Sequence, residues 1–297
     1  GWALSRNKRN QRHCVGSNEC ITGCPSGAKR STLSTWLPRF FRSGGELFTH
    51  AKVERLRLRG HRAVGVRGRL QGSEGSRRFD VEAKAVVLSC GAVQTPLLLQ
   101  RNRLCRPCGR VGRHFTVHPN IKVAASFDSP VHSMRGTHQA WQCTEFIKEG
   151  ILLAPGSVPL PFLTTVFKDV GDALARRMAN HAYYATGGIL VEDSTEGRIQ
   201  TLPLGIPLIR YDVAAVDQGK FVKATGKLAE LYFAAGAREV YTAFNSIPVL
   251  HSPDDIPKIA KAAPKVRDTE YFTAHIMGTC RMHEEARGGV VNPNGET

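Results

Sequence analysis

A short segment around Gly91 has the residue types that a nucleotide-binding bend requires. A continuous apolar run at positions 85–88 leads into the small residues Ser-Cys90-Gly91-Ala92, and a helical pattern follows. The phosphates of a cofactor approach a backbone closely only where side chains are absent, and the start of a helix supplies unpaired N–H groups. Cys90, Gly91 and Ala92 are therefore candidates for cofactor binding, although many α/β proteins turn from strand to helix through such a Gly-Ala pair.

Three cysteines lie close together near the start of the chain. Cys14, Cys20 and Cys24 follow a C-x5-C-x3-C-P pattern, and Cys105 and Cys108 form a C-x-x-C pair. Closely spaced thiolates followed by Pro occur in ferredoxins, although the spacing there is shorter. A four-thiolate metal site would need the fold to bring the two groups together. An iron–sulfur or zinc-binding electron-transfer module built on these five cysteines is the alternative hypothesis, whereas the favoured interpretation assigns no metal ligand.

Two histidines and a further cysteine are the remaining candidates for catalysis. His114 and His118 have the chemistry of an acid–base pair, and Cys280 has that of a nucleophile. No base partner of Cys280 is evident in the sequence, and buried histidines and thiols are commonly structural. The catalytic residues are therefore unknown at the level of sequence.

The positive charge of the chain is concentrated in its first part. The formal net charge is +16, and residues 1–113 carry 23 Lys and Arg against 6 Asp and Glu. Nucleic-acid binding would explain such an asymmetry, and a non-catalytic binding domain is a third hypothesis. However, Arg55, Arg57 and Arg59 alternate along an apparent strand with no interleaved aromatic stacking platform. We therefore expect a solvated Arg-rich surface and no nucleic acid as partner.

Length and apolar patterning bound the class of protein. The 297 residues, 41% of them hydrophobic, suit one large or two ordinary soluble domains. The sequence has no run of about 18 uncharged apolar residues, so we expect no transmembrane segment. No signal peptide is visible either. The localisation is unknown from the sequence: a cytoplasmic location is favoured, but a segment preceding Gly1 would hide any signal.

The first part of the chain is expected to build a small meander followed by a buried strand. Residues 31–41 have the pattern of a short helix. Apolar residues then alternate through positions 56–58, 64–70 and 79–83, with glycine-containing turns between them. This alternation predicts three antiparallel strands with one polar face. The unbroken apolar run at 85–88 predicts a strand buried on both faces, as in a parallel sheet.

The second part is expected to be a mixed sheet with helices. The pattern predicts a strand at 121–127, a hairpin of strands at 185–191 and 198–202, a helix from 212 to about 235 and a strand at 239–244. The predicted fold class is therefore α/β, or α+β overall. It combines part of a parallel sheet and a three-stranded antiparallel meander with a mixed antiparallel sheet and helices.

Four blocks of sequence occur in the order found in one family of flavoenzymes. They are Gly23-Cys-Pro-Ser-Gly-Ala-Lys-Arg-Ser-Thr32 with Trp36-Leu-Pro38, the bend at Gly91-Ala92, residues 109–119, and His275-Ile-Met-Gly-Thr-Cys280-Arg-Met282. Over nearly its whole length the chain resembles the glucose–methanol–choline (GMC) family of FAD-dependent oxidoreductases. Two positions depart from the family pattern: Ser17 stands where relatives often have Cys, and His283 replaces a usual Gly.

The resemblance implies a domain organisation and a cofactor. Part of the FAD-binding domain, the substrate-binding domain and a truncated return to the first domain would comprise residues 1–119, 120–267 and 268–297. The cofactor would be FAD, with its adenine against the backbone near Val53. Its ribose and pyrophosphate would lie at Gly91 and Ala92, beside Cys90. No Gly-x-Gly-x-x-Gly opens the sequence, so the turn that would hold the FAD pyrophosphate is missing.

The resemblance also implies an activity. An enzyme of this family would oxidise a primary or secondary alcohol to an aldehyde or ketone by hydride transfer to the flavin. Its substrate would be a small-molecule alcohol, and its electron acceptor oxygen, a quinone or a redox protein. The blocks are closer to choline-dehydrogenase-like and long-chain-alcohol-oxidase-like members than to sugar oxidases. The residues that accept the alcohol proton would lie beyond Thr297, so this chain alone is expected to bind FAD poorly and to be inactive.

Overall fold

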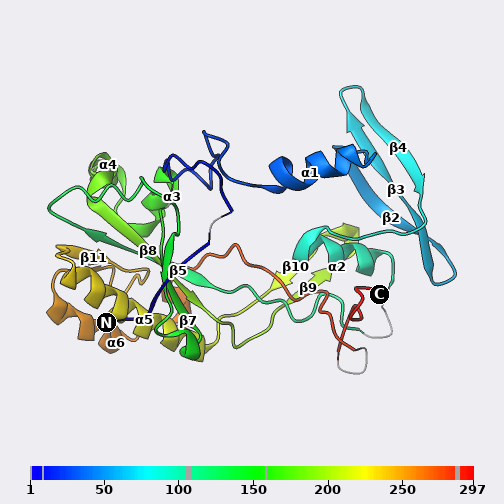
Figure 1. Ribbon diagram of the computed structural model, residues 1–297. Coiled ribbons are helices and arrows are strands. Elements are labelled where there is room, and N and C mark those ends of the chain that lie inside the picture. Colours follow the sequence, from blue (N-terminus) through cyan, green and yellow to red (C-terminus); the bar gives the residue numbers. More distant parts are fainter. Residues whose placement is uncertain (1, 9, 105–108, 158, 285–287) are drawn as a thin grey trace. The chain divides into compact units, whose positions relative to one another are not determined.

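The computed structural model describes residues 2–8, 10–104, 109–157, 159–284 and 288–297. The chain divides into two compact units that interleave along the sequence (Figure 1). The first unit contains Gly1–Pro38, His118–Ser194 and Val213–Ala274, and the second contains Arg39–Val117, Thr195–Asp212 and His275–Thr297. The predicted functional division into residues 1–119, 120–267 and 268–297 stays a prediction.

The first unit is built on an antiparallel sheet. Its strands are β1 (Leu4–Arg6), β5 (Asn120–Ser126), β6 (Trp141–Cys143), β7 (Ile151–Pro155), β8 (Tyr184–Val191), β11 (Glu239–Tyr241) and β12 (Val249–Leu250). Within the described residues their order across the sheet is β1-β6-β7-β8-β5-β11-β12, and each pair of neighbours runs antiparallel.

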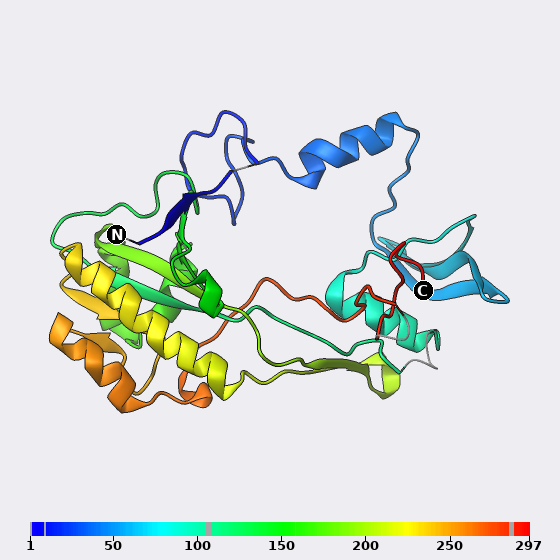
Figure 2. The ribbon, with the colours of Figure 1, turned by 60° about the horizontal axis from the view of Figure 1, so that its bottom comes forward.

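Helices cover this sheet on both faces. On one face lies α5 (Ala215–Ala234), with α6 (Ile256–Ala262) beside it (Figure 2). Ile121 and Val123 of β5 share the core with Phe221 of α5, and all three are fully buried. Ala124, on the opposite face, belongs to a second core with Phe167. That side carries α3 (Leu160–Leu163), η2 (Thr164–Val166), α4 (Gly171–Ala179) and η3 (His181–Tyr183).

The second unit combines a meander, a helix and a short hairpin. The meander consists of β2 (Ala51–Arg59), β3 (Arg62–Gly72) and β4 (Gly75–Glu82). It is followed by α2 (Gly91–Arg101) and by the pair β9 (Arg198–Thr201) and β10 (Pro207–Arg210), joined by η4 (Pro203–Gly205). Leu97 of α2 packs in a core with Phe115, Val117 and Ile199.

The remaining helical segments are short or lie at the boundary between the units. They are α1 (Thr32–Arg42), η1 (Ile147–Glu149), η5 (Pro253–Asp255) and η6 (Val266–Asp268). The helix expected at 31–41 is thus present as α1, which runs from the first unit into the second. In the part of the chain that is described, no helix has the length and apolar character needed to cross a membrane.

The predicted fold class and meander are confirmed, but the buried strand at 85–88 is wrong. Its residues belong to no ladder among those described, and Val87 is 85% exposed. A strand must exchange hydrogen bonds with a neighbour, and none of the described strands runs beside this segment. The parallel part of the expected sheet is therefore not formed among the described residues.

The predicted hairpin of residues 185–191 and 198–202 is also wrong. Strand β8 pairs with β5 on one edge and β7 on the other, so neither edge is available to β9. Strand β9 instead pairs with β10 in the second unit. Strand β8 is therefore a central strand, with both edges paired and both faces covered. The apolar pattern of its residues does not show which strands are its neighbours. The long helix expected from residue 212 is present, but it begins at Ala215. The strand expected at 239–244 is also present, but it ends at Tyr241.

Candidate functional site

The predicted cofactor bend lies at the first turn of α2. Cys90 is the N-cap residue, and Gly91 opens the helix with a φ of +78°. This left-handed conformation favours glycine, and a Cβ at position 91 would meet no described heavy atom within 4 Å. The Cys90 side chain makes no capping bond to the helix among the described residues. The backbone N–H of Cys90 donates to the hydroxyl of Thr95 at 3.0 Å. A helix start led by glycine suits the close approach of an anion.

A threonine from the end of the chain replaces a hydrogen bond that Pro96 removes from α2. Pro96 has no N–H, so the carbonyl of Ala92, four residues earlier, lacks its helical donor. The Thr279 hydroxyl donates to this carbonyl oxygen at 2.6 Å, and Thr279 is 2% exposed. The first turn of α2 is thereby fixed by the terminal His-x-x-Gly-Thr-Cys-Arg-Met block.

Two glycines allow residues 109–119 to pack closely against the terminal block and against β9. The N–H of Gly112 donates to the carbonyl oxygen of Thr279 at 2.9 Å. A Cβ at Gly278 would lie 1.8 Å from the carbonyl oxygen of His114, and one at Gly112 would lie 2.1 Å from that of Ile199. Any side chain would push these segments apart. The blocks at 109–119 and 275–282, which the sequence analysis singled out, therefore meet at the start of α2.

Gln100 anchors the other end of the same helix. Its side-chain nitrogen donates to the carbonyl oxygens of Val111 and Ile199, both at 3.0 Å. Its side-chain oxygen accepts from the N–H and the hydroxyl of Thr201, at 2.8 and 2.9 Å. All four hydrogen-bonding positions of one amide are thus used. Gln100 and Thr279 together hold α2 in a fixed position within the second unit.

The meander contacts α2 at the helix's C-terminal end. The side-chain oxygen of Asn102 accepts from the N–H of Leu56 at 2.9 Å, and Arg55 donates to the carbonyl oxygen of Arg101 at 2.8 Å. Val53, half-buried, lies three residues before Leu56 on β2. The structure thus brings Cys90, Gly91 and Ala92 together at one end of the helix, while Val53 lies on the strand that contacts the other end.

The two candidate histidines each have a partner of their own. Nδ1 of His114 lies 2.5 Å from a carboxylate oxygen of Glu196, whose other oxygen lies 3.9 Å from Arg281. The backbone N–H of His118 donates to a carboxylate oxygen of Asp193 at 2.7 Å. His114 belongs to the second unit and His118 to the first. These contacts fit the structural role that the sequence favoured for both histidines, and their acid–base alternative stays untested.

The clustered cysteines do not gather around a common point in the described structure. Cys14, Cys20 and Cys24 are all free thiols. The Cys24 sulfur accepts from the N–H of Lys29 at 3.4 Å, and this bond, with the hydroxyl of Ser26, lowers the pKa of the thiol. Among the residues described, no three His, Cys, Asp or Glu side chains are grouped so as to hold a metal ion. Cys105 and Cys108 lie outside the described residues.

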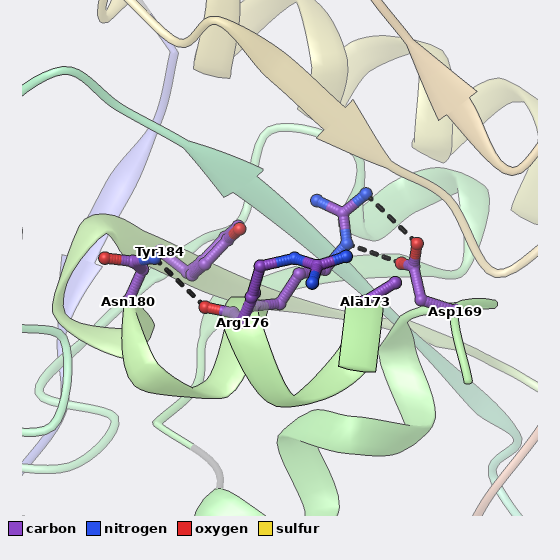
Figure 3. Close-up of a pocket in the computed structure, with 6 residues that line it drawn as sticks. Asp169, Ala173, Arg176, Asn180 and Tyr184 are labelled. Carbon is purple, nitrogen blue, oxygen red and sulfur yellow. Dashed lines mark hydrogen bonds and ion pairs between the residues drawn. The ribbon is translucent and has the colours of Figure 1, made fainter. Parts of the chain in front are cut away.

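An unforeseen concavity of the first unit lies over α4. It is lined by Asp169, Ala173, Arg176, Arg177, Asn180 and Tyr184 (Figure 3). Arg177 donates to Asp169 at 2.5 Å and to the hydroxyl of Tyr241, also at 2.5 Å. Its guanidinium lies 4.7 Å from the centroid of the Tyr241 ring. Burial acts against its charge, but the hydrogen bond to Asp169 raises the pKa of Arg177 overall. These paired groups fix α4 to the sheet.

Comparisons with known proteins place the chain in one family. The GMC oxidoreductase family model matches residues 1–120. An uncharacterized GMC-type oxidoreductase of Mycobacterium tuberculosis is 34% identical over 281 residues, which are 94% of this chain and 44% of that protein. The chain belongs to the GMC oxidoreductase family. A long-chain-alcohol oxidase of Arabidopsis thaliana is 24% identical over 336 residues, covering 99% of this chain and 42% of the plant protein.

A solved structure shares the fold. An FAD-dependent oxidoreductase from Chaetomium thermophilum superposes with a TM-score of 0.57 and 12% sequence identity, covering 89% of this chain and 57% of that one. At this identity the likeness concerns the fold alone. The chain spans about half the length of the curated relatives that it matches.

GMC oxidoreductases are FAD-dependent, and the start of α2 fits such a cofactor. Gly91 presents bare backbone, and open space lies where its Cβ would be. The hydrogen bond from Thr279 to the Ala92 carbonyl fixes the first turn of α2. A ligand at the helix start would therefore meet a backbone that is already positioned. The residues present therefore suit the ribose and pyrophosphate of a dinucleotide.

Three residues that matter here were missed by the sequence analysis. Thr279 stood inside a recognised block, and the proline within α2 was a signal that some donor must serve the Ala92 carbonyl. Glu196 stood in the segment interpreted as a hairpin turn. Gln100 carried no signal, because three of its four hydrogen bonds go to Ile199 and Thr201, about 100 residues away in sequence.

Proposed function

We propose that this GMC oxidoreductase chain is part of an FAD-dependent enzyme that oxidises an alcohol to an aldehyde or ketone. The observation that carries the proposal is the glycine-led start of α2, held by Thr279 from the terminal block. Family membership and the long-chain-alcohol oxidases among the relatives support it. Because the chain spans about half the length of those relatives, the activity is proposed for the whole protein.

Each candidate residue has a defined part in this proposal. The backbone of Gly91 and Ala92, beside Cys90, binds the ribose and pyrophosphate of FAD, because a helix start attracts negative charge and glycine removes steric hindrance. The N–H of Cys90 donates to Thr95, so Cys90 contributes its position and not this donor. Val53 presents backbone to the adenine. The bound flavin supplies the hydride acceptor for the carbinol carbon. The residues of this chain bind and orient the cofactor, and none of them is assigned as the acceptor of the alcohol proton.

The substrate is proposed to be a small-molecule alcohol that binds against residues 120–267. The choline-dehydrogenase-like and long-chain-alcohol-oxidase-like branches remain the two candidate classes, and the relatives named long-chain-alcohol oxidase favour the second. Oxygen, a quinone or a redox protein reoxidises the flavin. These acceptors are distinguished by the rate at which each restores the oxidised spectrum.

An anaerobic alcohol titration tests the proposal. The protein expressed from the whole open reading frame is purified, its flavin is quantified, and alcohols of increasing chain length are added without oxygen. We expect bleaching of the visible flavin absorption, with one reduced flavin per aldehyde or ketone formed. A flavin-free protein, or a bound flavin that none of the alcohols reduces, would contradict the proposal.

Metal analysis of the same preparation tests the alternative hypothesis. An electron-transfer module that uses Cys14, Cys20, Cys24, Cys105 and Cys108 requires iron or zinc in stoichiometric amount. Stoichiometric metal in a protein that lacks flavin would favour that module. Flavin without stoichiometric metal would favour the alcohol-oxidising enzyme.

A further inference from the structure

A lysine lies on the face of the sheet opposite α5. Ile121 and Val123 of β5 point into the core that includes α5, so Lys122 between them points to the other face. The side chain is half-buried. Its Nζ lies 4.7 Å from the centroid of the Phe272 ring, which packs under the ammonium group.

Two glycines make room for this ammonium group. Lys122 is the register partner of Gly188 on β8, which in turn is the register partner of Ala154 on β7. A Cβ at Gly188 would lie 2.7 Å from Nζ of Lys122, and one at Gly156 would lie 3.4 Å from it. The ammonium group therefore occupies space that side chains at these positions would fill. Its position is fixed over the backbone of β8 and the end of β7.

No carboxylate among the described residues balances this charge. Among the described residues, the group that Nζ contacts is the ring of Phe272. Burial lowers the pKa of Lys122 from 10.5 to about 8, and no nearby acid raises it. Holding an ammonium partly out of water is unfavourable unless an anion compensates it. The site is therefore suited to a ligand that brings a negative charge.

We propose that Lys122 binds a carboxylate of the substrate, so that the alcohol bound at this face is a hydroxy acid. An ammonium and a carboxylate form a charge-assisted hydrogen bond. Phe272 is 42% exposed and offers an apolar surface beside it for the carbon chain of such a molecule. The identity of the ligand as a substrate rests on the proposed function, whereas carboxylate binding by Lys122 does not require flavin.

Protection of Lys122 from an amine-reactive reagent tests this inference on the chain itself. The chain is acetylated briefly with and without a hydroxyalkanoate, or with the uncharged diol of the same length, and each lysine is followed by peptide mass spectrometry. We expect the hydroxyalkanoate to slow modification of Lys122 several-fold and to leave the exposed Lys148 unaffected. Equal protection by the diol, or protection by neither compound, would overturn the proposal.

Substitutions distinguish the effect of the Lys122 charge from the effect of where its ammonium group lies. Lys122→Met keeps the length of the side chain and removes the ammonium, and we expect it to weaken hydroxyalkanoate binding about 10-fold or more. Lys122→Arg keeps a cation and should recover part of the affinity. Gly188→Ala places a Cβ 2.7 Å from Nζ and displaces the ammonium without removing it, so an intermediate loss is expected. Lys148→Met is the matched control, with unchanged affinity.

The outcomes distinguish this inference from the proposed function. If the whole protein reduces its flavin with diols as fast as with hydroxyalkanoates, and Lys122→Met changes neither rate, the hydroxy-acid assignment fails while the proposed function stands. If hydroxyalkanoates protect Lys122 but the protein binds no flavin, the carboxylate site stands while the proposed function fails. Circular dichroism of each variant verifies that the sheet is intact.

Discussion

The hydroxyl of Thr279 donates to the carbonyl oxygen of Ala92 at 2.6 Å across 187 residues of sequence. Pro96 makes this bond necessary, because it leaves the Ala92 carbonyl without its helical donor. The bond ties the terminal block of the chain to the first turn of α2, where Gly91 opens the proposed cofactor site. Fold stability and the proposed cofactor site are therefore linked through one side chain.

Replacing Thr279 with Val removes the donor and keeps the shape of the side chain. We expect a loss of about 1–2 kcal/mol in the free energy of unfolding, because the Ala92 carbonyl is then left without a partner. Urea denaturation of the chain measures this loss. Thr279→Ser restores a hydroxyl and should recover most of the stability. Identical unfolding midpoints for Thr279→Val and the unsubstituted chain would show that the bond contributes nothing.

Asp217 is a fully buried carboxylate. It stabilises the fold when the pH is above the ordinary pKa of a carboxyl group. Burial raises its pKa, but hydrogen bonds from the N–H and hydroxyl of Ser194 and from Lys220 outweigh this effect and lower it. The folded chain therefore binds the proton less readily than the unfolded chain does. The stabilising contribution is present above about pH 3.8 and is lost as the pH falls through the lower, folded pKa.

Asp217→Asn tests this contribution. We expect the free energy of unfolding to fall by roughly 2–4 kcal/mol at pH 7, and the difference from the unsubstituted chain to shrink in acid. The exposed Asp254→Asn is a matched control with little expected effect. A difference that stays constant from pH 7 down to pH 2 would contradict the assignment.

Lys122 predicts a pH dependence of the same sign as that of Asp217, but in an alkaline window. Its pKa is lowered from 10.5 to about 8 in the folded chain, so the folded state binds fewer protons than the unfolded state between these values. Stability should therefore rise with pH across this window, by roughly 3 kcal/mol in total. Lys122→Met should be the more stable protein at pH 7, and its advantage should vanish near pH 10.5. Parallel stability curves for the two proteins would contradict the lowered pKa.

The local parts of the fold could be predicted from the sequence, and the long-range pairings could not. Alternation and glycine turns gave the meander, since each of its strands pairs with the next along the chain. The residues of β8 looked like one half of a hairpin with β9, but both edges of β8 are occupied by strands from distant segments. Pairing between distant strands has no local signature.

In the candidate site, too, local features could be predicted from the sequence and long-range contacts could not. The bend at Gly91 could be predicted because it depends on adjacent residues: the glycine permits the positive φ, and the helix begins at the same position. The residues that hold α2, namely Thr279 and Gln100, act through partners far away in sequence and were not foreseen. Lys122 was not foreseen either. Only the ladder reveals that a glycine lies beside its ammonium group.

The flavin content of two glycine variants tests the central claim most directly. Gly91 and Gly60 have similar backbone conformations, with φ of +78° and +59°, and a Cβ at either would meet no described heavy atom within 4 Å. Valine at each position therefore imposes comparable strain, but only position 91 lies at the start of α2. In the protein from the whole open reading frame, we predict that Gly91→Val lowers bound FAD on the order of 10-fold, while Gly60→Val retains it. Equal flavin content in the two variants would contradict the account.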